Sequence, residues 1–203
     1  MKGFVFTELF NLVENKFGYK TLQNTIKRAN VPNNGIYVSG GYYTIEELNS
    51  LVLALSEETG IPAQELLFLY GRHLFSILIK SYSFFADGKK SPIEFMASVD
   101  EYIHVEVRKL HPNAELPSFK IESQTEDSIV LIYESKRGLE AFAKGMMFGC
   151  ADFYNTVIDV QYAPMDRPNT SRFVVKLIKG AVPEPKSEFE KKATPSFFKR
   201  LFG

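Results

Sequence analysis

Apolar residues recur every three or four positions through the first half of the chain, which is the spacing of one helix face. Two helix starts also carry capping signals: Thr44 precedes Glu47, and Ser91 precedes Glu94, by three residues. In such a pair the hydroxyl and the carboxylate both bind free backbone amides at the helix start. The pattern predicts helices over residues 4–17, 21–29, 44–58, 62–80 and 92–110.

The second half of the chain is strand-like instead. Short stretches rich in β-branched and aromatic residues predict strands over residues 118–122, 128–133, 156–162 and 172–178. Between the second and third strands, residues 139–154 carry a broad apolar stripe that predicts one helix. The other connections are too short for crossover helices, so the strands fit an antiparallel sheet and the fold class is α+β.

Residues 181–203 differ from the rest of the chain. Three prolines break regular structure there, and the segment ends in the aromatic and basic stretch 197–202. We expect a flexible C-terminal tail. Docking of this stretch on a partner or on the protein's own core is the alternative.

Composition narrows the class of protein. The chain has 203 residues, 45% hydrophobic and 24% charged, which fits one globular domain with a tail. Lys plus Arg equals Asp plus Glu, at 24 each, which argues against a nucleic-acid binder. The single Cys150 excludes an intramolecular disulfide and a cysteine-rich zinc site. With no signal peptide and no apolar run of roughly 18 residues, we expect no membrane span and a cytoplasmic protein.

Common catalytic signatures are missing from the sequence. There is no phosphate-binding glycine loop, no dinucleotide fingerprint, no zinc-protease motif and no nucleophile elbow. His73, His104 and His111 do not cluster at zinc spacing. We therefore expect the protein not to be an enzyme.

One row of polar residues points to a ligand. Tyr133, Ser135 and Arg137 would share one face of an extended strand, where residues i, i+2 and i+4 point the same way. Arginine grips a carboxylate through two charge-assisted hydrogen bonds, so the row suits a ligand with carboxylates. Read alone, an ordinary solvated strand face is the simpler interpretation.

Two further features add to this picture. His104 follows Ile103, about 100° around the predicted helix, at the border of its apolar stripe. A partly buried structural histidine is the plainer reading, but neutral imidazole is also a good iron ligand. The stripe of Phe142, Met146 and Cys150 reads as core. Together the features would give one nitrogen ligand, a carboxylate clamp and apolar walls, which is what a haem needs.

These residues resemble the haem nitric oxide/oxygen-binding (H-NOX) family over about residues 1–180. The resemblance rests on the opening Met1-Lys2-Gly3, the histidine segment and the Tyr133-x-Ser135-x-Arg137 triplet, which is the family's hallmark. The other matching segments are residues 56–62, 68–72 and 117–119. The family's fold packs a helical N-terminal part, here 1–80, on a C-terminal part with a four-stranded antiparallel sheet, here 81–180, and buries the haem between them.

The resemblance also implies a role for each candidate. His104 would be the axial ligand of a haem b, and Tyr133, Ser135 and Arg137 would hold its propionates. Pro117 would press on the macrocycle. The distal walls would come from Val5, Leu9, Leu74, Phe142 and Met146.

The resemblance places Phe142 where oxygen-binding relatives carry a distal tyrosine, five residues after Arg137. A phenylalanine offers no hydrogen-bond donor, so we expect a nitric oxide sensor that also binds carbon monoxide and excludes oxygen.

The sensor would signal to a separate sensor histidine kinase or diguanylate cyclase/phosphodiesterase through rearrangement of the haem and the proximal helix. Gly3 and Gly71 would be hinges or simply packing glycines. An oxygen-binding haem protein and a haem-free interaction module remain the alternatives.

Overall fold

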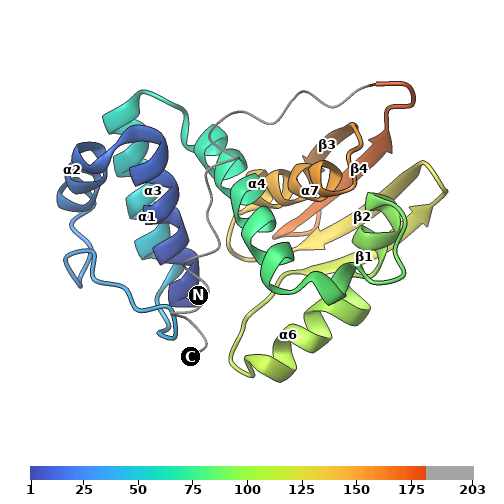
Figure 1. Ribbon diagram of the computed structural model, residues 1–203, viewed down its shortest axis with the longest axis horizontal. Coiled ribbons are helices and arrows are strands. Elements are labelled where there is room, and N and C mark those ends of the chain that lie inside the picture. Colours follow the sequence, from blue (N-terminus) through green and yellow to red (C-terminus); the bar gives the residue numbers. More distant parts are fainter. Residues whose placement is uncertain (182–203) are drawn as a thin grey trace. The chain divides into compact units, whose positions relative to one another are not determined.

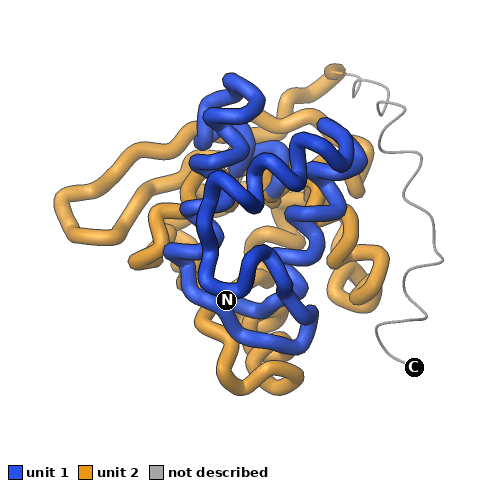
Figure 2. The backbone as a smooth tube through the Cα atoms, turned by 90° about the vertical axis from the view of Figure 1, so that its left-hand side faces the viewer, with its two compact units in different colours: residues 1–70, 184–203 blue, residues 71–183 orange. Residues whose placement is uncertain are grey.

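The computed structural model describes residues 1–181, so the predicted tail, apart from Ala181, lies outside the described residues. The described chain falls into two units, residues 1–70 and residues 71–181, which are coloured separately in Figure 2. The division between Tyr70 and Gly71 lies inside one helix, α4 (Ala63–Ser81). None of the helices within residues 1–181 is long and apolar enough to cross a membrane.

The first unit is helical, as the apolar spacing predicts. Besides the first part of α4, it consists of α1 (Gly3–Phe17), α2 (Tyr19–Ala29) and α3 (Ile45–Thr59). The predicted capping box is present: the Thr44 hydroxyl accepts from the Glu47 amide, and the Glu47 carboxylate accepts from the Thr44 amide, both at 3.2 Å. Gly60 ends α3 in the left-handed region, with φ 73°.

The loop of residues 31–43 folds back against the start of α1. The Gly3 amide donates to the Gly41 carbonyl at 2.9 Å, and the Tyr37 ring stacks on Phe6 with centroids 4.4 Å apart. A Cβ on Gly3 would overlap the carbonyl oxygen of Val38. Gly3 has no positive φ, so the structure requires glycine here for close packing.

We expect Gly3→Ala to lower the free energy of unfolding by about 1–3 kcal/mol, because the added methyl group must push the loop backbone away from α1. Urea unfolding would measure the loss. Gly40→Ala is the matched control in the same loop, since a Cβ there would meet no atom within 4 Å. An unchanged unfolding midpoint for Gly3→Ala would contradict this close packing.

The second unit contains the predicted four-stranded antiparallel sheet. Its strands are β1 (Ser118–Gln124), β2 (Ser128–Glu134), β3 (Ile158–Pro164) and β4 (Thr170–Leu177), in the order β1-β2-β4-β3. Helix α7 (Glu140–Phe153) lies between β2 and β3 in sequence, as predicted, and packs on the sheet (Figure 1). The α+β fold class is thereby confirmed. The shared core includes Phe75 of α4, Met147 and Cys150 of α7, and Leu131 and Phe173 of the sheet.

Within this unit α4 and α7 approach each other closely through glycines. A Cβ on Gly71 would overlap the Phe142 carbonyl oxygen, and one on Gly149 would lie 2.8 Å from the Arg72 carbonyl oxygen. Nearby, the Arg72 guanidinium binds both carboxylate oxygens of Asp152, at 2.6 and 2.8 Å. Gly71 has no positive φ, so here too glycine serves close packing. The position of Phe142 therefore depends on the contact with α4.

The predicted helix 92–110 is wrong as a single helix. The structure has α5 (Pro92–Ala97), a π-helical segment η2 (Val99–Ile103) and α6 (His104–Leu110), preceded by the short 3₁₀ helix η1 (Ser83–Ala86). The Ile103 amide donates to the Ser98 carbonyl, five residues back, at 3.1 Å. The Ser98 hydroxyl donates to the Phe95 carbonyl at 2.8 Å. A serine bonded back in this way favours a bend, so the regular pattern ends there.

Candidate functional site

His104 stands at the junction of the π-helical segment and α6, with its side chain 12% exposed. Its Nδ1 donates to Oδ1 of Asp100, one helical turn earlier, at 3.3 Å. The other oxygen of Asp100 accepts from the Ser118 hydroxyl at 3.4 Å, where β1 begins. Asp100 therefore braces the imidazole and ties its helix to the sheet. Neither Asp100 nor Ser118 was singled out from the sequence.

The environment of His104 favours its neutral form. Burial lowers the pKa of the imidazole, and this outweighs the hydrogen bond with Asp100, which acts in the opposite direction. Since a carboxylate accepts in this bond, the ring proton is assigned to Nδ1. This is the tautomer in which a histidine braced by a carboxylate binds a metal.

The predicted single-face row of Tyr133, Ser135 and Arg137 is wrong in its geometry. Tyr133 is buried within β2, but the strand ends at Glu134, and the next residues form a turn that reaches Gly138 with φ 63°. The Ser135 amide donates to the Asn169 carbonyl at 2.9 Å, and the Arg137 amide to the Ser135 hydroxyl at 3.3 Å. The first bond extends the β2–β4 pairing by one residue, so the chain turns only after Ser135, where the second bond closes the turn.

The turn nevertheless brings the three side chains together. Burial raises the pKa of Tyr133, while a hydrogen bond with Ser135 and the charge of Arg137 act to lower it. Tyr133 also lies near the histidine, because the Phe119 ring is 5.1 Å from the Tyr133 ring and 6.1 Å from the His104 ring. The imidazole and the polar triplet therefore belong to one region of the second unit.

Arg137 holds a carboxylate, which is the chemistry that the triplet predicts. Its Nη2 donates to Oε2 of Glu115 at 2.7 Å. The arginine side chain is only 16% exposed, whereas that of Glu115 is 86% exposed. The hydrogen bond with Arg137 is the main reason why the pKa of Glu115 is lowered. Glu115 thus stands in for an external carboxylate, and no motif or spacing in the sequence identifies it.

The remaining candidates are divided between the units. Leu74 of α4 is buried, and Phe142 and Met146 of α7 are half-buried, in the second unit. Pro117, half-buried, comes directly before β1 in the same unit. Val5, half-buried, and Leu9, buried, belong to α1 of the first unit.

The groups in the second unit fit a haem. A neutral imidazole suits the iron, and an arginine that already holds a carboxylate suits a propionate. Within residues 1–181, no group of three or more His, Cys, Asp or Glu side chains could hold a metal ion without a porphyrin.

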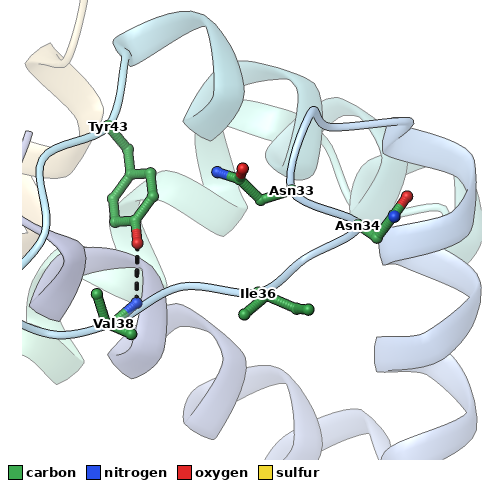
Figure 3. Close-up of a pocket in the computed structure, with 5 residues that line it drawn as sticks. All are labelled: Asn33, Asn34, Ile36, Val38 and Tyr43. Carbon is green, nitrogen blue, oxygen red and sulfur yellow. Dashed lines mark hydrogen bonds between the residues drawn. The ribbon is translucent and has the colours of Figure 1, made fainter.

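A pocket of about 390 Å³ lies elsewhere, in the first unit (Figure 3). Asn33, Asn34, Ile36, Val38 and Tyr43 line it, and the Val38 amide donates to the Tyr43 hydroxyl at 2.9 Å. None of these five residues is among the candidates.

Comparisons with known proteins agree with the resemblance. Residues 2–162 match the sequence profile of the family described as Haem-NO-binding. The structure is similar to the unliganded Fe(II) H-NOX protein from K. algicida, with 34% identity, a TM-score of 0.84, and 91% of this chain and 100% of the other covered. No curated protein sequence matches the chain.

Two further solved structures show the same fold. The H-NOX protein from Shewanella woodyi, bound to IWP-051 in the Fe(II)CO state, is 37% identical, with a TM-score of 0.75 and coverage of 89% of this chain and 97% of the other. The H-NOX protein from S. oneidensis in the Fe(II)NO state is 24% identical, with a TM-score of 0.79 and coverage of 88% and 99%.

Proposed function

The chain belongs to the haem-NO-binding, or H-NOX, family, and we propose that it is a sensor that binds nitric oxide at a ferrous haem b and excludes oxygen. The observation that carries this proposal is the pairing of a neutral, braced imidazole at His104 with an arginine clamp at Arg137. Imidazole and clamp lie in one unit and meet the two chemical demands of a haem.

Each residue has a distinct task in holding the haem. His104 offers Nε2 to the iron, and Asp100 keeps the ring oriented through Nδ1. Tyr133, Ser135 and Arg137 bind the propionates, and Pro117 contacts the macrocycle. When bound, the haem supplies an iron with one coordination position open to a diatomic gas.

The gas selectivity follows from the side chains proposed for the distal wall. Bound oxygen carries partial negative charge and is stabilised by a hydrogen-bond donor, whereas nitric oxide and carbon monoxide depend on one much less. Val5, Leu9, Leu74, Phe142 and Met146 carry no N–H or O–H group in their side chains. We therefore infer that this wall binds nitric oxide and carbon monoxide in preference to oxygen.

The link to a partner would run through α6. None of the seven residues of this helix, all of them described, is fully buried. His104 bonds to Asp100, and Val107 of the same helix packs against the core of the second unit. A shift of His104 would move α6 and change the surface shown to a sensor histidine kinase or a diguanylate cyclase/phosphodiesterase, which are the partner classes proposed from the resemblance.

Absorption spectra of the reduced protein test the proposal. We expect a Soret band under argon that shifts with nitric oxide and with carbon monoxide and does not convert to an oxygen complex in air. A stable oxygen complex would instead support an oxygen-binding haem protein. A protein that stays colourless after reconstitution with haem would support a haem-free interaction module and overturn the proposal.

A further inference from the structure

We propose that Glu115 is an internal competitor for the haem carboxylates: its carboxylate binds the Arg137 guanidinium that a propionate would need, so it must yield when the haem binds. This inference rests on the proposed function, because it assumes that Arg137 binds a propionate. The residues named so far favour haem binding, whereas Glu115 would oppose it.

The first support is the chemistry of the pair. The carboxylate of Glu115 lies 2.7 Å from the Arg137 guanidinium, in the charge-assisted bond that a propionate would make. A propionate arriving at Arg137 with Glu115 still in place would bring a second negative charge to one positive group. Like charges at one site disfavour each other, so haem binding is opposed whether Glu115 leaves or stays.

The second support is that only one partner of the pair is firmly placed. Arg137 is mostly buried and belongs to the turn that Ser135 and Gly138 fix. Glu115 is almost fully exposed and lies in the connection between α6 and β1, which has no helix or strand of its own. Glu115 can therefore swing into solvent while the arginine keeps its place.

The position of Glu115 also connects the clamp to the haem contact. Glu115 stands two residues before Pro117 and three before Ser118, whose hydroxyl binds Asp100. The short connection thus carries the competitor and the macrocycle contact, and it leads directly into β1, whose first residue binds the brace on His104. Release of Glu115 would relax the segment whose proline lies against the macrocycle.

Glu115→Gln tests the proposal, because glutamine keeps the shape and removes the charge. Haem-free full-length protein is titrated with ferric protoporphyrin IX and followed by absorbance. We expect the variant to bind about two- to fivefold more tightly, the range that corresponds to an exposed ion pair. Glu122→Gln is the matched control: Glu122 accepts from Arg172 at 2.7 Å in an exposed pair within the sheet, and its loss should leave haem affinity unchanged.

Two further arms identify the cause. Glu115→Gln should have no effect on the binding of protoporphyrin IX dimethyl ester with ferric iron, which has no free carboxylate, and none in an Arg137→Ala background. Unchanged or weaker binding of ordinary haem to Glu115→Gln would overturn the competitor role. If the wild-type chain bound no haem, the proposed function itself would fail, and the wild-type titration would show this separately.

Discussion

Replacing His104 with glycine is expected to lower haem affinity by about a hundredfold or more and to remove the ferrous spectrum of a histidine-bound haem. Loss of a group that merely supports a ligand costs ten- to a hundredfold in affinity, so loss of the ligand costs at least the upper end of that range. Titration of the haem-free variant with haem, followed by spectra of the reduced complex, measures both effects.

Exogenous imidazole should restore the spectrum of the His104→Gly variant, because it supplies the missing nitrogen in the space that the side chain leaves. His111→Ala is the control, since it removes an imidazole at the other end of α6, outside the proposed site. If the reduced spectrum were unchanged in His104→Gly and altered in His111→Ala, the assignment of His104 as the iron ligand would be wrong.

Phe142→Tyr is expected to give the protein an oxygen affinity that the wild type lacks. The new hydroxyl would donate to bound oxygen in an apolar setting, and a hydrogen bond to a charged group contributes about 1.5–3 kcal/mol, or roughly ten- to a hundredfold in affinity. Nitric oxide affinity should change far less. Spectra of the reduced variant across a series of oxygen pressures provide the measurement.

Phe153→Tyr adds the same hydroxyl at the far end of α7, where the side chain is 44% exposed, and should leave gas binding unaltered. The backbone of Phe142 packs against Gly71, so the ring is carried on a firmly placed segment. If Phe142→Tyr showed no gain in oxygen affinity while keeping its haem, the selectivity would have to come from other residues than the proposed distal wall.

Local signals account for what could be predicted from the sequence. Thr44 and Glu47 lie three residues apart, and the hydrogen bonds of their capping box involve only these two residues. Gly60 ends the same helix because glycine readily adopts the left-handed conformation. Strand β2 follows from an alternation of large apolar residues that face the core: Ile129, Leu131 and Tyr133. Such signals depend on neighbouring residues within one helix or strand, so they can be recognised in the sequence without knowing the fold.

Features that depend on contacts across the chain escaped prediction. Glu115 and Arg137 are 22 residues apart, and no periodicity relates them. The chain turns after Ser135 because the pairing of β2 with the β4 side ends at Asn169, which has φ 57°. Asp100 is different, because it lies one turn before His104, and this spacing could have identified it as the partner of the ring.

The π-helical segment before His104 has a consequence for how relatives are aligned. Its wider turn accommodates one more residue than an α-helical turn of the same height. Deleting a single residue between Val99 and Ile103 would restore ordinary winding and leave the imidazole near its present direction, because the removed residue is the extra one. A relative with ordinary winding here would thus be one residue shorter before its histidine, and a gap misplaced by one residue would match the histidine to the wrong position.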